Sequence, residues 1–259
     1  MTGTGGRTLS LIVGLLVVVF MAAPLLLVVI FSFNASVVMT FPFEGLTLDW
    51  YRQLLARDDF WSALRNSAIV TLSVGIGATV IGTMASLVIV RMRPRRSDTA
   101  FFLFGLPMMM PPLVLALALL ALFSAVGLKL SLMTVVLAHL TFTMPFVILI
   151  VTARLRDFDH AVTDSARDLG ASPWTSFRTI TLPIIRPTLF GAALIAMALS
   201  LDDFIITFFM LGGGNTLPTL VWGMLRTGID PSINALGTLI LVCTLGASAL
   251  ALKLTGYRG

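Results

Sequence analysis

Charged residues and cysteine are scarce in this chain of 259 residues. Asp, Glu, Lys and Arg together make up 11% of it, whereas soluble domains carry about 25%. The chain has one cysteine, Cys243, which lies in an apolar run. Because there is only one, neither an internal disulfide nor a cysteine-based metal site can form. These two shortages exclude a soluble domain and a disulfide framework.

Apolar residues take the place of the missing charge. They make up 58% of the chain, and the mean hydropathy is +1.01. This composition is typical of an integral membrane protein. The first apolar run, Leu9–Phe33, is longer than the roughly 7–15 residues of a signal-peptide core, so we interpret it as a retained spanning helix. We expect a single membrane domain over residues 1–259.

Six apolar runs approach or exceed the length of about 20 residues that a spanning helix needs. They are Leu9–Phe33, Asn66–Val90, Ala100–Phe123, Leu130–Ala153, Pro187–Leu211 and Ser232–Leu252. Because the pattern consists of long runs and not of short alternating segments, it excludes a closed barrel. The predicted fold class is an all-α membrane protein with six transmembrane helices.

The basic residues predict the orientation of these helices. With the N-terminus inside, the cytoplasmic segments hold most of them: Arg7, Arg91, Arg93, Arg95, Arg96, Arg154, Arg156, Arg167, Arg178, Arg186, Lys253 and Arg258. The opposite segments hold only Arg52, Arg57, Arg65, Lys129 and Arg226. This positive-inside bias predicts that both termini are cytoplasmic. It also explains the net charge of +5 by topology, without a nucleic-acid partner.

The long cytoplasmic connection, residues 154–187, has the pattern of two helices joined by a turn. Its first half places apolar and small residues at helical spacing, from Phe158 to Leu169. Gly170 suits the left-handed position that ends a helix. Ser172 and Pro173 suit the first positions of a second helix, which we expect to end at Thr181, before Pro183. The residues alone leave two interpretations open: a rigid knob that inserts into a partner, or an ordinary amphipathic connector.

A resemblance decides between them. The loop resembles the signature of ABC importer permeases: Glu-Ala-Ala, three residues, Gly, nine residues, Ile-x-Leu-Pro. Here the elements are Asp164-Ser165-Ala166, Gly170 and Ile180-Thr181-Leu182-Pro183, with both spacings intact and Asp-Ser-Ala in place of Glu-Ala-Ala. The resemblance implies that this loop, including Ala171 and Ser172, docks on an ATPase subunit.

The resemblance covers nearly the whole chain. The stretches SFNAS (32–36), HLTFTMPFV (139–147), DLGAS (168–172), LSLDDFIITFF (199–209) and INALGTLIL (233–241) are similar to the second permease of spermidine/putrescine importers. This family implies a type I importer fold in a bacterial inner membrane. It also implies a homologous permease partner, two ATPase subunits and an external substrate-binding protein. The chain has no phosphate loop, so ATP and Mg²⁺ are expected in the ATPase, and no cofactor is expected here.

Asp202 and Asp203 are the acidic pair inside an apolar run. Ionised carboxylates within a membrane are costly, and by default they suggest a function. Asp202 lies 15 residues after Pro187, so about 22 Å along a helix, which places the pair in the outer half of the membrane. We expect at least one carboxylate to line the substrate pathway. The alternative is that both are structural, at an interface with a neighbouring helix or subunit.

The third apolar run contains a proline-rich segment, LPMMMPPLVLAL. Pro107, Pro111 and Pro112 should break or kink this helix, which makes Pro111 and Pro112 candidates for the pathway wall. Polyamine permeases commonly carry an acid directly after the proline of a Met-x-Pro segment, whereas this chain has Pro112 there. The substrate is therefore expected to be a polyamine or a related small organic solute, such as an opine or a phosphonate.

Other classes of function have less support in the sequence. A self-contained secondary transporter would be favoured by internal repeats, and none stands out. An enzyme would need a convergent catalytic or metal constellation, and we identify none. His139 is expected to be a packed or hydrogen-bonded interior residue. Trp50 and Tyr51 are expected at the membrane interface, and LGGGNTLP (211–218) is expected to be a flexible external turn.

Overall fold

The computed structural model describes residues 4–38, 40, 42–159, 161–228 and 230–255, and its regular structure is almost entirely helical. The chain divides into two compact units. One comprises residues 1–61 and 221–259, and the other comprises residues 62–220. The single domain expected over residues 1–259 stays a prediction.

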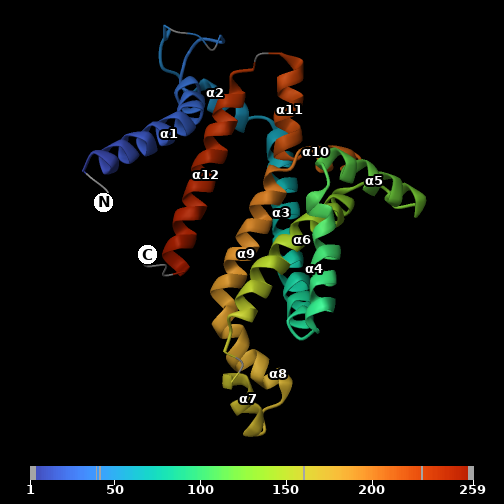
Figure 1. Cartoon of the computed structure of the whole chain (residues 1–259). Coiled ribbons are helices and arrows are strands. Elements are labelled where there is room, and N and C mark those ends of the chain that lie inside the picture. Colours follow the sequence, from blue (N-terminus) through green and yellow to red (C-terminus); the bar gives the residue numbers. More distant parts are fainter. Residues whose placement is uncertain (1–3, 39, 41, 160, 229, 256–259) are drawn as a thin grey trace. The chain divides into compact units, whose positions relative to one another are not determined.

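The unit of residues 62–220 is a helical bundle with a projecting loop. Helices α3, α4, α6 and α9 run side by side, α5 turns away from them, and α7 and α8 project at the end where α6 stops (Figure 1). The elements are α3 (Asp58–Ile89, which begins in the other unit), α4 (Pro94–Met109), α5 (Pro112–Ala125), α6 (Leu132–Arg156), α7 (Ala161–Asp168), α8 (Pro173–Ser176), the π-helix η1 (Phe177–Thr181), α9 (Leu182–Asp202) and α10 (Ile205–Met210).

Small residues let α3 approach its neighbours closely, as is common between membrane helices. A Cβ at Gly82 would lie 2.8 Å from Val147 Cγ1 of α6, so only glycine fits there. One turn later the Ser86 hydroxyl donates to the Ile148 carbonyl of α6 at 3.3 Å. A Cβ at Gly75 would collide with the Met197 side chain of α9. α3 therefore packs against both α6 and α9.

Two apolar clusters complete this bundle. One joins α5, α6 and α10 to α3, and its fully buried members include Ala116, Val135, Ala138 and Met210. The other joins α3, α6 and α9 through Ala78, Val147, Val151, Leu155, Ile185, Ala192 and Ala196. The polar residues of the candidate site lie on α6, α9 and α10, three of the helices that these two clusters join.

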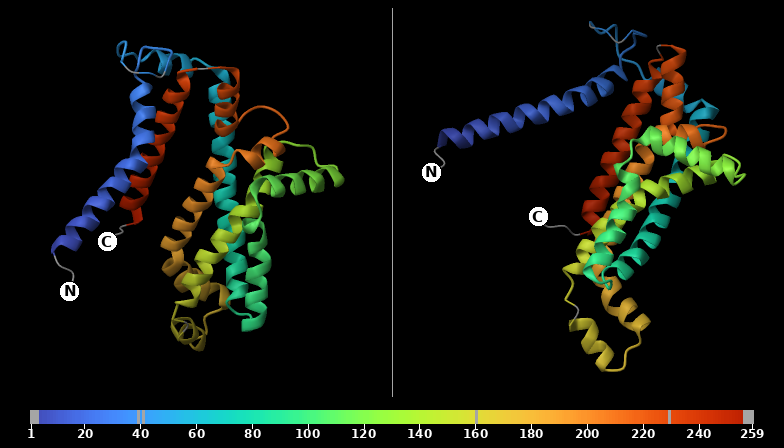
Figure 2. Two further views of the ribbon diagram at one scale, coloured as in Figure 1. Left: turned by 45° about the horizontal axis from the view of Figure 1, so that its top comes forward. Right: turned by 45° about the vertical axis from the view of Figure 1, so that its right-hand side comes forward.

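The other unit contains α1 (Thr4–Phe31), α2 (Asp49–Leu55), α12 (Ser232–Thr255) and the end of α11 (Leu217–Thr227). α12 contacts both α1 and α2 (Figure 2). The two aromatics expected at the membrane interface tie α2 to the end of α1. Trp50 Nε1 donates to the Asn34 carbonyl at 2.7 Å, and the Tyr51 hydroxyl lies 2.7 Å from Ser32 Oγ.

Four helices in the described part of the chain are long and apolar enough to cross a membrane: Gly6–Phe31, Asp58–Ile89, Leu132–Arg156 and Pro173–Asp202. The predicted third span is instead two helices, Pro94–Met109 and Pro112–Ala125, which bend by 101°. The described apolar part of the last helix, Ser232–Gly246, is shorter. The chain is thus an all-α protein with four or five candidate spans.

The break in the third span occurs where its prolines predict it. Met110 is extended, with ψ of 140°, because the residue before a proline is disfavoured in the helical region. Pro111 then caps α5, and Pro112 occupies its first turn, where a missing N–H costs nothing. Pro107 stays inside α4.

The predicted fifth span, Pro187–Leu211, is wrong at both ends. Helical structure already begins at Pro173 and runs through η1 into α9 without interruption. Pro183 does not end the second loop helix, because the π-helix shifts the hydrogen-bond register. Leu182 N–H donates to the Phe177 carbonyl, and Pro183 falls in the first turn of α9, where its missing N–H is tolerated. At the other end, α9 stops at Asp202.

Candidate functional site

The predicted docking loop contains the expected helix, turn and second helix. α7 ends in a Schellman motif: Gly170 N–H donates to the Arg167 carbonyl at 2.9 Å, and Ala171 N–H donates to the Ala166 carbonyl at 3.0 Å. Gly170 has a φ of +89°, a conformation that side-chain-bearing residues rarely adopt. The helix-ending role predicted for Gly170 is confirmed.

The second helix begins as the sequence predicts. Ser172 Oγ accepts the Thr175 N–H at 3.1 Å, and Pro173 fills the first turn. α7 buries none of its residues, and Leu169 and Trp174 are 90% and 67% exposed. Asp164, Ser165, Gly170, Ser172 and Pro183 are exposed, whereas Ala166, Ala171, Ile180 and Leu182 are half-buried. The loop therefore presents an uncovered surface with two large apolar side chains.

The acidic pair lies at a break in the helix, which the sequence did not predict. α9 ends at Asp202, and Asp203 is extended, with φ of −71° and ψ of 121°. The Asp203 carboxylate accepts the Thr207 N–H at 2.9 Å, so it satisfies a free donor in the first turn of α10. The Thr207 hydroxyl donates to the Asp203 carbonyl at 3.0 Å. We call residues 203–204 the α9–α10 break.

His139 of α6 lies against this break. The imidazole is 1% exposed, and its Nδ1 lies 2.8 Å from Ser200 Oγ of α9. Its Nε2 lies 2.9 Å from Thr207 Oγ1 of α10 and 3.2 Å from Asp203 Oδ2. The prediction of a hydrogen-bonded interior histidine is confirmed. Nothing in the spacing of the sequence indicates that its partners flank the acidic pair.

The two carboxylates have different surroundings. The Asp203 side chain is 11% exposed, while Asp202 is exposed. A small cavity of about 10 Å³ adjoins Asp203 and is lined by both polar and apolar residues: Ser67, Val70, Thr71, His139, Ser200, Leu201, Thr207, Thr216 and Pro218. This volume accommodates about one water molecule. Pro111 and Pro112 are exposed and do not line this cavity.

The glycine-rich turn after α10 is held by specific contacts. Asn66 Nδ2 donates to the Asn215 carbonyl at 2.8 Å, and Leu217 N–H donates to Ser67 Oγ at 2.8 Å. A Cβ at Gly212 would collide with the Leu130 backbone. The turn expected to be flexible is thus packed against α3 and the start of α6. Its close approach to other backbone requires glycine.

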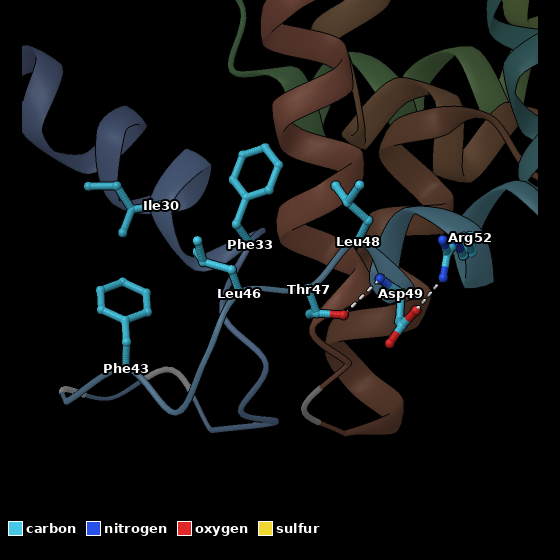
Figure 3. A pocket seen from close by; sticks show the side chains of 8 residues that line it. All are labelled: Ile30, Phe33, Phe43, Leu46, Thr47, Leu48, Asp49 and Arg52. Carbon is cyan, nitrogen blue, oxygen red and sulfur yellow. Dashed lines mark hydrogen bonds and ion pairs between the residues drawn. The ribbon is translucent and has the colours of Figure 1, made fainter.

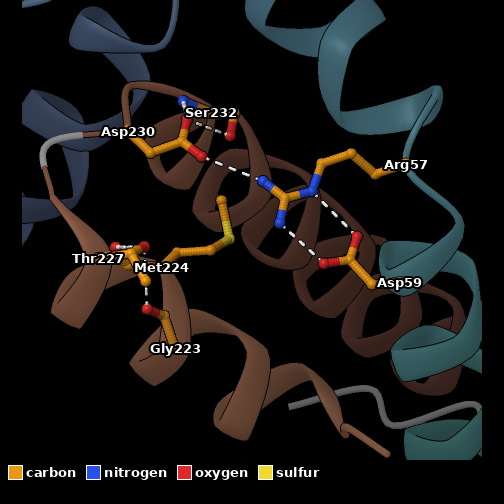
Figure 4. A network of polar contacts seen from close by, with 7 residues as sticks. All are labelled: Arg57, Asp59, Gly223, Met224, Thr227, Asp230 and Ser232. Atoms are coloured by element: carbon orange, nitrogen blue, oxygen red, sulfur yellow. Dashed lines mark hydrogen bonds and ion pairs between the residues drawn. The ribbon is translucent and has the colours of Figure 1, made fainter.

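The unit of residues 1–61 and 221–259 holds two features that the sequence did not indicate. An apolar groove of about 820 Å³ lies between the end of α1, the following loop and α2, with Asp49 and Arg52 at its edge (Figure 3). A charged network also joins Arg57 to both Asp59, at 2.8 Å, and Asp230, at 3.1 Å (Figure 4). Hydrogen bonding to Asp59 raises the pKa of Arg57, so its guanidinium stays charged.

Comparison with known proteins gives the class to which this fold and loop belong. Residues 78–254 match the family of binding-protein-dependent transport system inner membrane components. The chain belongs to this family, and within it to the spermidine/putrescine permeases. It is therefore a multi-pass inner-membrane transport component and not the ATPase of its system.

Particular relatives cover most of the chain. It is 39% identical to the putrescine transport system permease protein PotI of Escherichia coli over 86% of this chain and 82% of that protein. It is 32% identical to the spermidine/putrescine transport system permease protein PotC of Escherichia coli, over 87% of this chain and 86% of that protein. A bacterial ABC transporter that imports alginate has the same fold, with a TM-score of 0.77, 16% identity and 96% coverage of both chains.

Proposed function

We propose that this chain is a permease subunit of an ATP-driven importer for putrescine or spermidine. The proposal rests on the 39% identity to a putrescine permease across most of the chain. The exposed carboxylate of Asp202 supports it, because a cationic substrate that loses water is stabilised by a nearby negative charge in a medium of low dielectric.

The proposed assembly contains a second, homologous permease, two ATPase subunits and an external binding protein. ATP and Mg²⁺ bind to the ATPase subunits. The ATPase docks on the loop of residues 154–187, where α7 buries none of its residues and Leu169 and Trp174 are exposed. In this proposal the chain crosses the membrane six times, with the bent pair and α12 as the third and sixth spans, and both termini are cytoplasmic.

The proposed pathway passes Asp202. Asp203 is already engaged by Thr207 and His139, and the cavity beside it holds about one water molecule, which is too little for a polyamine. Asp203 is therefore assigned a structural role. The exposed elbow at Pro111 and Pro112 is proposed as a second part of the pathway wall.

A second candidate function is import of another small organic solute, such as an opine or a phosphonate. The observation that favours it is Pro112, which stands where polyamine permeases commonly carry an acid. In the structure Pro112 lies in the first turn of α5, so this position supplies no carboxylate to a cation.

Uptake measurements separate the two candidates. The chain is expressed with its partner subunits and binding protein in cells that lack polyamine importers, and uptake of labelled putrescine, spermidine, an opine and a phosphonate is compared. We expect ATP-dependent uptake of at least one polyamine, inhibited by excess of the unlabelled polyamine. Uptake of the opine or phosphonate alone would assign the second function.

A further inference from the structure

We propose that His139 is a positioning residue that fixes the α9–α10 break and thereby the direction of the Asp202 side chain. The inference rests on the proposed role of Asp202 in the pathway. Its starting point is that each imidazole nitrogen contacts a residue on a different side of the break. Ser200, before the break, lies 2.8 Å from Nδ1, and Thr207, after it, lies 2.9 Å from Nε2.

The geometry gives the imidazole a specific task. Ser200 is two residues before Asp202, in the last turn of α9. Within the described residues, its bond to Nδ1 is the one polar side-chain contact between this turn and α6. α10 is held to α6 at a further point, where the Thr134 hydroxyl donates to the Met210 carbonyl at 2.8 Å. Loss of the imidazole contacts therefore frees the end of α9 more than it frees α10.

The chemistry of the side chain also fits this task. A neutral imidazole donates at one nitrogen and accepts at the other. With Nε2 as the donor toward Asp203 Oδ2, Nδ1 accepts the Ser200 hydroxyl. An apolar side chain offers neither bond: it leaves the Ser200 hydroxyl without its imidazole partner and leaves the Asp203 carboxylate with Thr207 alone. Glutamine offers one donor group and one acceptor, so it is the conservative replacement.

The test measures motion at Asp202 directly, without relying on transport. A nitroxide is attached to Asp202→Cys in a Cys243→Ala background, in the assembled complex. With His139→Leu we expect a narrower electron paramagnetic resonance spectrum than in the parent complex, because the last turn of α9 moves more freely. With His139→Gln we expect the line width to return most of the way to that of the parent. A label at Leu103→Cys, an exposed position on α4, is the control and should not change.

Transport kinetics are measured separately, with Asp202 intact. We expect His139→Leu to raise KM for the polyamine about tenfold while kcat changes less, and His139→Gln to restore most of the affinity. Unchanged mobility at position 202 in an assembled His139→Leu complex would overturn the proposal. Increased mobility with unchanged KM would support the positioning role and instead contradict the pathway role of Asp202.

A milder variant keeps the proposal testable if His139→Leu does not assemble. Ser200→Ala removes only the bond on the α9 side and leaves Thr207 and Asp203 in place. We expect a smaller increase in mobility at position 202 in the same direction. An assembled Ser200→Ala complex with the parent spectrum would overturn the proposal.

Discussion

Asp202 and Asp203 are adjacent in sequence, yet the helix ends between them. Asp203 accepts the Thr207 N–H and faces His139, whereas the carboxylate of Asp202 is exposed. Hydropathy alone identifies the pair as exceptional. It cannot identify which acid is buried, because that depends on the break and on a histidine more than 60 positions away in the chain.

Replacement of each acid by asparagine should separate their roles. Asp203→Asn weakens the contacts to Thr207 and His139, so we expect it to destabilise the complex by about 1–3 kcal/mol. Asp202→Asn removes charge at an exposed position, so we expect normal assembly and basal ATPase activity but loss of most polyamine uptake. Thermal unfolding and uptake are measured for both variants. If both variants have the thermal midpoint and the polyamine uptake of the parent complex, both assignments are contradicted.

Gly170 offers a second test at the scale of a single residue. Its φ of +89° means that Gly170→Ala strains the backbone by about 1–2 kcal/mol. We expect weaker association with the ATPase and less substrate-stimulated hydrolysis, and we expect Gly170→Asp to abolish transport. Gly213→Ala is a matched control, because Gly213 is also an exposed loop glycine with open space around it, but without a positive φ. Full transport by Gly170→Asp would contradict the docking role of the loop.

At the scale of elements, the sequence predicts where helices exist better than where they stop. The spans expected at Asn66–Val90 and Leu130–Ala153 correspond to α3 and α6, because long apolar runs dominate both. The π-helix at Phe177–Thr181 and the α9–α10 break were not predictable, since both depend on hydrogen-bond register and on contacts with α6. α11 was also missed, because its 11 residues are too few for a span.

The elbow between α4 and α5 yields a prediction at this scale. Pro111→Ala with Pro112→Ala restores two N–H donors and releases Met110 from its extended conformation, so we expect the 101° bend to decrease. Spin labels at the exposed positions Leu103 and Leu122 should then move apart, as measured by pulsed dipolar spectroscopy. Pro107→Ala is the control, because Pro107 lies inside α4. An unchanged distance in the double variant would mean that packing, and not proline, sets the bend.

At the scale of the whole molecule, the positive-inside bias predicts the orientation. The test uses single cysteine substitutions at Gly213 and Asp98 in a Cys243→Ala background. Both positions are exposed. We expect an impermeant thiol reagent applied from outside to label position 213 and not position 98, and to label both after membrane permeabilisation. The reverse pattern would place the loop of residues 154–187 outside and remove the basis for ATPase docking.

The continuity of Pro173–Asp202 has a mechanical consequence. These 30 residues are helical without interruption, which amounts to about 45 Å of helix at 1.5 Å per residue. Trp174 lies near one end of this segment, on the projecting loop, and Asp202 is its last residue. A displacement or twist at Trp174 therefore has a continuous helical backbone along which it can reach Asp202. The π-helix is the one part of the segment with a different winding, so it is where part of a twist would be absorbed before it reached the carboxylate.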